Sequence, residues 1–572
     1  MRPKYKILFS ILVFLIFVVV PLTGIGAVWV QHVGLLPGTA VVFPSDAATM
    51  DRFMAAALKP YYGDRVGICD GTNDHVEVQA ALDAVDEVLL SVGTFNCEVS
   101  VTIDSYQTFR GCGRNTILTT TTADLDIITA TGGSGTEKVG ILIADLCIDG
   151  DAGFVTNDMG ILWTYIDYSV IRNIWSIDNG EDGISLVTCD NNIILGNICS
   201  GNDNAGVYLE TCSYNTITNN NWSNHSIAGI YIYDSSHNTI VGNTSQADYE
   251  GIYIFESSYI TITGNTCFDN GENCMWIEDS SDNTISGNTC STGVEGIYLD
   301  GSSANTVTGN TCQGNYRGIH LFNSSKNTVI GNTCQVNDEM GIWIEVTSHS
   351  TVMGNILTEN SQDTTNTYDD IFIENNSDYN NIQGNTCRAG LEANKPRYGI
   401  NIATANSDKN IVDGNDIYDD GFGTAPFNDT GTLTIVKSSN RGIQITDVKD
   451  YIYIKNTSGA QRVTGDVVRH KAVAVGNEFD MPTANGEDSV LGMVAETINN
   501  NAYGYVQVLG MTTVLKATNA GGNIAIGDYL CTENGVRARL AGAGDMAFAR
   551  ALEACAAADC TIDALIISPM KI

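Results

Sequence analysis

The sequence Asn305-Thr-Val-Thr-Gly-Asn310-Thr-Cys312, continued by Gly318-Ile-His-Leu321, decides the fold of this chain. In both pieces the residues alternate between an inward and an outward side, which is typical of β-strands and not of helices. The Gly-Asn pair tolerates the left-handed backbone of a tight corner. The stretch therefore predicts short strands that are joined by tight corners.

An asparagine recurs along the chain with the period of this unit. Successive steps are 24, 23, 23, 22, 23, 22, 22, 23, 30 and 30 residues. The ladder consists of Asn173, Asn197, Asn220, Asn243, Asn265, Asn288, Asn310, Asn332, Asn355, Asn385 and Asn415. Such a period indicates a solenoid, because each repeat buries its apolar face only against its neighbours. We expect these side chains to stack at one corner of every coil, in a structural role and not as sugar or metal ligands.

Two apolar ladders accompany the asparagines. An aliphatic residue lies three positions before each of them: Val170, Ile194, Ile217, Ile240, Ile262, Ile285, Val307, Val329, Val352, Ile382 and Val412. Two positions after many of them lies a cysteine: Cys199, Cys267, Cys290, Cys312, Cys334 and Cys387, with Trp222, Ser245 and Leu357 interrupting the row. Neighbouring coils lie about 4.8 Å apart, so inward thiols in register pack as small apolar groups. We expect both ladders to form the core.

Over roughly residues 64–420 the repeat resembles the right-handed parallel β-helix family, in particular its carbohydrate-binding and sugar-hydrolase type repeats. The resemblance implies an all-β solenoid with the pectate lyase fold. It is specific for fold and poor for function, because this fold hosts lyases, hydrolases, epimerases and inert adhesins.

The segment before the repeats resembles the helical cap that opens many pectate-lyase-like and tailspike helices. Its motif is Cys69-Asp-Gly-Thr-Asn-Asp74, with a helix expected from Val76 to Val85, Asp74 as N-cap and Glu77 three residues on. A cap is needed because the open end of a solenoid exposes apolar edges. The predicted domains are a signal peptide or anchor (1–30), a linker and helical cap (31–87), the β-helix (88–420), a hinge (421–431) and a C-terminal β domain (432–572).

The chain is strongly acidic, with a formal net charge of −38. Such a charge argues against nucleic acid and anionic membrane surfaces as partners. Arg172 is the sole Lys or Arg between Asp151 and Tyr316. Enzymes that grip an acidic polysaccharide need cations facing the sugar carboxylates, so we expect a neutral glycan in place of a pectin.

The N-terminus has the features of an export signal. Arg2, Lys4 and Lys6 precede an apolar stretch over residues 7–20, and small residues follow Pro21. The signal is either cleaved or retained as a membrane tether through residues 7–30. Both alternatives place the body of the protein outside the cytoplasm, in the extracellular space or at the cell surface.

Sixteen cysteines in an exported chain raise the question of disulfides. The candidates outside the inward ladder are Cys555 with Cys560, and Cys69 with Cys97. The sequence contains no Cys-x-x-Cys pair and no His cluster, so neither a metal nor a cofactor is expected.

The C-terminal part departs from the repeat. Gly465-Asp466-Val-Val468 and Gly527-Asp528-Tyr-Leu530 resemble the small β-barrel of phage capsid-decoration and fibre-end domains. The resemblance covers about residues 460–572 and implies a module that forms a homotrimer or docks to a surface. The alternative is a simple stopper for the β-helix.

The outward positions of the Gly-Ile-x-Ile strands carry aromatic rings and carboxylates. The predicted aromatic stripe is Tyr208, Tyr231, Tyr253, Trp276, Tyr298, His320, Trp343 and Phe372. Two residues further on lie Glu210, Tyr233, Phe255, Glu278, Asp300, Phe322, Glu345 and Glu374. Exposed apolar rows need a reason. The stripe either binds sugar rings, or stabilises the sheet by cross-strand packing, or docks a protein.

Function is predicted from this stripe. The first reading is a glycan-binding surface adhesin or fibre-like protein, with Tyr208, Tyr231, Tyr253, Trp276, Tyr298, His320, Trp343 and Glu345 binding a polysaccharide or cell-surface glycan. The alternative is a glycoside hydrolase, or a polysaccharide lyase, acting on a neutral extracellular polysaccharide. Hydrolysis needs two neighbouring carboxyl groups, and Glu278 as acid with Asp300 as nucleophile or base are the candidates. A virion tail-fibre or spike protein is the third reading.

Overall fold

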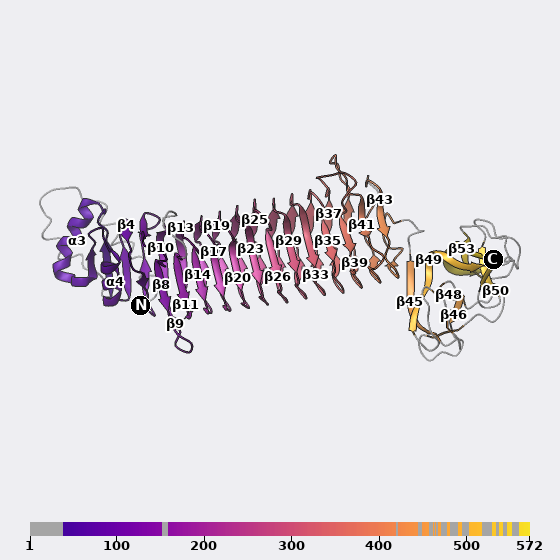
Figure 1. The fold of residues 1–572 in the computed structure, drawn as a ribbon, viewed down its shortest axis with the longest axis horizontal. Helices are drawn as coiled ribbons and strands as arrows, with labels where there is room; N and C mark the ends of the chain where they lie inside the picture. Colours follow the sequence, from indigo (N-terminus) through magenta and orange to yellow (C-terminus); the bar gives the residue numbers. More distant parts are fainter. Residues whose placement is uncertain are drawn as a thin grey trace, which may run out of the picture. The chain divides into compact units, whose positions relative to one another are not determined.

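A computed structural model describes residues 38–150, 158–418 and 421–443 in full, together with the backbone of the strands between residues 449 and 571 (Figure 1). The chain divides into two compact units, Met1–Gly271 and Glu272–Ile572, and each is described by itself. The predicted signal or anchor lies outside the described residues, as does Cys555. Within the described part, no helix is long and apolar enough to span a membrane.

The N-terminal cap of the first unit contains the helices α3 (Thr49–Tyr62) and α4 (His75–Ala84). They accompany β1 (Thr39–Phe43), which pairs in parallel with β2 (Val66–Ile68) and β3 (Glu87–Leu90). The helix predicted after Asp74 is present, with Asp74 at its N-cap position as predicted, but the Asp74 side chain makes no capping hydrogen bond to the helix. The Asp74 carboxylate accepts hydrogen bonds from the backbone N–H groups of Gly71 and Asn96 instead, at 3.0 and 2.9 Å.

Each coil consists of short strands that pair in parallel with those of the next coil, and this all-β parallel solenoid confirms the predicted fold class. In the first unit, β18 (Thr216–Thr218), β19 (Asn221–Ser223) and β20 (Ala228–Tyr233) make one coil, and pair with β21 (Thr239–Val241), β22 (Thr244–Gln246) and β23 (Glu250–Phe255). In the second unit, β27 (Thr284–Ser286), β28 (Thr289–Ser291) and β29 (Glu295–Asp300) make a coil.

The predicted inward ladders form the core of both units, with one correction: Val170 is only half-buried, and Ile171 takes the inward position beside Ile194. Ile217, Ile285 and Val352 have no exposed surface, and neither do Cys199, Cys312 and Cys387. All the ladder thiols are free, as expected. The disulfide proposed between Cys69 and Cys97 in the cap is not formed, because both are free thiols.

The asparagine ladder runs through each unit as a chain of amide hydrogen bonds. The Oδ1 atom of Asn332 accepts from both the backbone N–H and the Nδ2 atom of Asn310, each at 2.9 Å. Its Nδ2 atom donates to Val307 O at 2.9 Å and to Asn355 Oδ1 at 3.0 Å. Because the coils on either side satisfy this buried amide, the ladder has the structural role that we predicted.

One member of the predicted ladder lies elsewhere. Arg172 is the register partner of Leu195, and the residue that donates its backbone N–H to Asn197 Oδ1 is Ile174. Asn173 is therefore one position out of register, at an exposed left-handed corner with φ 51°. The ladder also continues past Asn415 to Asn440, which accepts from Asn415 Nδ2 at 3.0 Å.

The parallel stacking continues through the predicted hinge. The strand β43 (Ala425–Asp429) pairs in parallel with β41 (Tyr398–Ile402), and β44 (Ile435–Val436) pairs with β42 (Ile411–Asp413). The following strands, among them β45 (Lys449–Asn456), β49 (Tyr503–Ala517) and β53 (Cys560–Lys571), pair mainly antiparallel. The C-terminal β domain is thus built of strands, and its barrel form stays a prediction.

Candidate functional site

The predicted stripe residues lie on consecutive strands of each unit. Tyr208 on β17 (Ala205–Glu210) is the register partner of Tyr231, which is the partner of Tyr253. In the second unit, five strands each contribute one ring at this position. They are β26 (Met275–Glu278) with Trp276, β29 with Tyr298, β32 (Arg317–Phe322) with His320, β35 (Ile342–Glu345) with Trp343 and β38 (Ile371–Glu374) with Phe372. We call the outward side of these five strands the stripe face.

The rings of the stripe stack on one another. Tyr231 and Tyr253 have centroids 4.7 Å apart and planes 14° apart. On the stripe face, Tyr298 and His320 are separated by 4.9 Å and 18°, and His320 and Trp343 by 4.2 Å and 3°. In these stacked pairs the ring faces cover each other and a ligand meets mainly ring edges, whereas Tyr208 with Tyr231 and Trp343 with Phe372 are tilted by 56° and 40°. This arrangement matches the sheet-stabilising alternative that the sequence left open.

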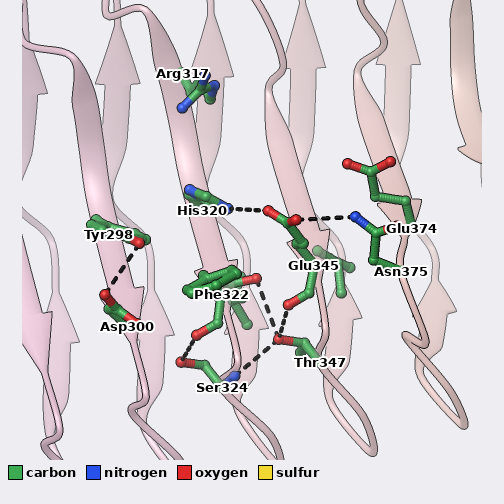
Figure 2. A network of polar contacts seen from close by, with 12 residues as sticks. Tyr298, Asp300, Arg317, His320, Phe322, Ser324, Glu345, Thr347, Glu374 and Asn375 are labelled. Atoms are coloured by element: carbon green, nitrogen blue, oxygen red, sulfur yellow. Dashed lines mark hydrogen bonds and ion pairs between the residues drawn. The ribbon is translucent and has the colours of Figure 1, made fainter.

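His320 is enclosed on the stripe face, although its sequence position predicts an outward ring. The residue is 5% exposed. Its Nδ1 atom lies 3.4 Å from Glu295 Oε1 and its Nε2 atom 3.7 Å from Glu345 Oε2 (Figure 2). Burial disfavours the charged imidazole, but the pairing with Glu295 and Glu345 outweighs it and raises the pKa of His320 above its ordinary value. His320 is therefore a buried partner of two carboxylates.

Arg317 is held between two buried carboxylates. Its guanidinium lies 2.6 Å from Glu295 Oε1 and 2.6 Å from Glu339 Oε2. It also covers the ring of Trp343, with 4.6 Å from Cζ to the ring centroid. A hydrogen bond to Glu339 raises the pKa of the Tyr368 hydroxyl to about 12. Because the charge of Arg317 is already neutralised, this cation is not free to bind an acidic sugar.

The carboxylate row beside the rings contains two register pairs. Glu278 lies opposite Asp300, and Glu345 lies opposite Glu374. Asp300 accepts a hydrogen bond from the Tyr298 hydroxyl at 3.3 Å. Burial nevertheless raises the pKa of Asp300 above its usual value. The predicted candidates Glu278 and Asp300 are thus brought side by side, and both are half-buried.

In the second pair, the pKa of Glu345 is lowered and the pKa of Glu374 is raised. The imidazole of His320 at 3.7 Å lowers the pKa of Glu345, and the Asn375 amide adds to this with a hydrogen bond of 3.0 Å (Figure 2). Burial, with the nearby negative charge of Glu345, raises the pKa of Glu374. An ionised carboxylate next to one that holds its proton more tightly is the arrangement that acid–base chemistry requires.

Sequence reasoning missed the roles of Glu295, Glu339 and Arg317. A signal was available, because Glu295 and Arg317 stand directly before the glycine of successive repeats and are register partners. Opposite charges at equivalent positions of neighbouring coils predict a cross-strand ion pair. Glu339 carried no such signal, since it lies at a turn between β34 (Thr333–Gln335) and β35.

Two family models match parts of the chain. One, described as periplasmic copper-binding protein (NosD), matches residues 114–279. The other, described as right handed beta helix region, matches residues 250–417. The chain is a right-handed parallel β-helix protein. No curated protein matches it.

The solved structures that are similar to this chain include an epimerase module, a phage tailspike protein and DFA-IIIase. The A-module of mannuronan C-5 epimerase AlgE6 from Azotobacter vinelandii is 14% identical, with 65% of this chain and 96% of that chain covered and a TM-score of 0.36. Tailspike protein 3 of bacteriophage CBA120 is 14% identical, with 68% and 61% covered and a TM-score of 0.44. DFA-IIIase from Arthrobacter chlorophenolicus A6 is 13% identical, with 55% and 94% covered and a TM-score of 0.40. At these identities and TM-scores the likeness carries no argument about what this chain does.

The NosD description names copper, and the residues of the matched region do not fit that metal. Among the described residues of 114–279, no three His, Cys, Asp or Glu ligand atoms gather within reach of one ion. The cysteines of its inward row, Cys199 and Cys267, are fully buried core residues. We therefore derive no copper chemistry for this β-helix.

Proposed function

We propose that this chain is an exported glycan-binding β-helix protein of the adhesin or fibre type, which binds a neutral polysaccharide along the stripe face. The observation that supports this proposal is the row of half-buried carboxylates Glu278, Asp300, Glu345 and Glu374 beside the aromatic ladder. Carboxylates accept hydrogen bonds from sugar hydroxyls. Coils recur about every 4.8 Å, and a pyranose unit is also on the order of 5 Å long.

The stacked rings change how such a glycan is held. Because Tyr298, His320 and Trp343 cover each other's faces, the sugar contacts ring edges and the Tyr298 hydroxyl in place of a flat aromatic platform. Affinity then depends more on the carboxylates than on any one ring. The ion pairs of Arg317 with Glu295 and Glu339 join neighbouring coils beside this surface.

A binding experiment tests the proposal. The full chain is screened on a glycan array, and each hit is titrated by calorimetry against the wild type and Glu278→Gln. Loss of one charge-assisted hydrogen bond is expected to weaken binding about tenfold. The matched control is Asp282→Asn, an equal charge change at an exposed corner with φ 58° that Asn tolerates. Equal affinity of both variants for every hit would contradict the proposal.

A second candidate function is hydrolysis of the bound glycan. The register pair Glu345 and Glu374 favours it, since one carboxyl is held ionised by His320 and Asn375 while its neighbour lies beside that charge. Glu374 then acts as acid and Glu345 as base or nucleophile. Reducing-sugar release that is abolished by Glu374→Gln, with binding retained, supports this function. If Glu278→Gln alone abolishes release, the pair predicted from the sequence is the catalytic one, and absence of any release leaves an adhesin.

A further inference from the structure

A group of potential metal ligands converges in the N-terminal cap, outside the stripe face. Cys69 follows β2, Asp74 directly precedes α4, and Glu77 lies in the first turn of that helix. The Cys69 thiol and one carboxylate oxygen from each of Asp74 and Glu77 all lie within 4.8 Å of one another. Cys69 and Asp74 are 1% and 0% exposed, whereas Glu77 is half-buried. The cluster thus has a closed inner side and a side that faces solvent.

The two carboxylates of the cluster act on a buried thiol. Burial, followed by the charges of Asp74 and Glu77, raises the pKa of the Cys69 thiol, and the other groups acting on it are Cys97 and Asp70. Grouping a thiol and carboxylates in a buried place costs free energy unless a cation neutralises them. Cys97 is free and 1% exposed, so two reduced thiols lie near these carboxylates.

The hydrogen bonds of Asp74 leave room for a metal. Each of its carboxylate oxygens accepts one backbone N–H, from Gly71 at 3.0 Å and from Asn96 at 2.9 Å. A carboxylate oxygen has a second lone-pair site. These two bonds orient the carboxylate in the way that outer hydrogen bonds orient metal ligands.

We propose that Cys69, Asp74 and Glu77 bind a zinc ion that ties α4 to β2 in the N-terminal cap. Zinc accepts thiolate and carboxylate ligands together, whereas calcium and magnesium take oxygen ligands alone. Tetrahedral zinc places its ligand atoms about 3.3–3.8 Å apart, given bond lengths of about 2.0–2.3 Å. The ligand atoms lie at most 4.8 Å apart, so they need to close by no more than about 1–1.5 Å on binding. A rotamer change of the half-buried Glu77 brings its carboxylate closer. Water completes the shell.

Zinc binding displaces the proton of Cys69 to solvent, because the thiolate is the ligand. Affinity for zinc therefore falls as the pH is lowered. The site is also in competition with a disulfide, since oxidation of Cys69 and Cys97 would remove the ligand. The protein must be kept reduced for the measurement.

The experiment uses the full chain, stripped of metal, reduced, and reloaded with zinc chloride alone. Bound zinc is measured by elemental analysis and by competition with a chromophoric chelator. One zinc per chain is expected for the wild type, with affinity lower by about tenfold or more in Cys69→Ser and in Glu77→Gln. Cobalt replaces zinc in a second measurement, in which a thiolate-to-cobalt absorption band is expected for the wild type and Glu77→Gln but not for Cys69→Ser.

Cys112→Ser is the matched control, because Cys112 is an exposed free thiol with no place in the cluster. It should bind zinc as the wild type does. If Cys69→Ser fails to fold, Glu77→Gln decides, since this half-buried side chain keeps its shape. Absence of bound zinc in the reduced wild type would overturn the proposal. Zinc binding unchanged in Glu77→Gln would overturn it as well.

Discussion

His320 is buried at a position where alternation predicts an outward ring. The residue is on the outer side of its strand, as expected, but Tyr298 and Trp343 cover both of its faces. Its two nitrogens face Glu295 and Glu345. Side-chain alternation determines the direction in which a residue leaves the strand, and neighbouring coils determine whether water reaches it.

Because the folded pKa of His320 is raised, its pairing stabilises the protein when the imidazole is charged. This contribution is complete below the ordinary value of 6.5 and is lost as the pH rises through the higher folded pKa. The pKa of Glu345 is lowered, so its contribution is lost at the acidic end. In urea titrations across the pH range, the wild type should lose on the order of 1 kcal/mol on the alkaline side. His320→Gln should lose this dependence, and an unchanged profile would contradict the charged pair.

Arg317 is the centre of the buried ion-pair network. Replacing it by Met leaves Glu295 and Glu339 buried without their cation, which should lower the free energy of unfolding by about 3 kcal/mol. Arg110→Met is the control, because Arg110 and its partner Glu87 have side chains that are 37% and 39% exposed. That pair should contribute less than about 1 kcal/mol. Similar losses in both variants, measured by chemical denaturation, would argue against a buried network.

At the scale of the element, the asparagine ladder is the feature that joins coil to coil. Asn332→Ala removes side-chain bonds to Asn310, Val307 and Asn355, and leaves the buried backbone N–H of Asn310 without this acceptor. The expected loss of unfolding free energy is about 3 kcal/mol. Asn173→Gly is the control, since Asn173 is exposed with φ 51° and glycine accepts that backbone without strain. If Asn173→Gly lowers the free energy of unfolding as much as Asn332→Ala does, Asn173 belongs to the ladder.

The strands themselves were predictable because their pattern is local. Ile217, Ile285 and Val352 mark inward positions by alternation alone, and their burial confirms it. Asn173 shows where the pattern fails, because Ile174 occupies the ladder position 23 residues before Asn197, and the spacing of 24 residues was the only signal. The strand β43 was not predicted, because it lies in a Gly-rich segment and its pairing with β41 depends on the preceding coil.

At the scale of the whole molecule, the C-terminal β domain carries the prediction about assembly. The parallel pairing extends to Val436, so a truncation that keeps the β-helix whole ends after residue 443. If the last domain trimerises the chain, as its resemblance to fibre-end domains implies, the full chain should be a trimer and the truncated chain a monomer. Light scattering at matched concentrations measures both. The same oligomeric state in the two proteins would contradict a trimerising role.

The sequence by itself determined the solenoid, its inward ladders and the strands that present the stripe. This was possible because each repeat meets an equivalent copy of itself, so a period along the chain becomes a ladder in space. Only the tertiary structure decided that the stripe rings cover each other, that Arg317 is enclosed by Glu295 and Glu339, and that Cys69 meets Asp74 and Glu77. These features depend on side-chain rotamers and on burial. In the β-helix both are determined by the side chains of the neighbouring coils, and in the cap by the turn that brings Cys69 next to α4.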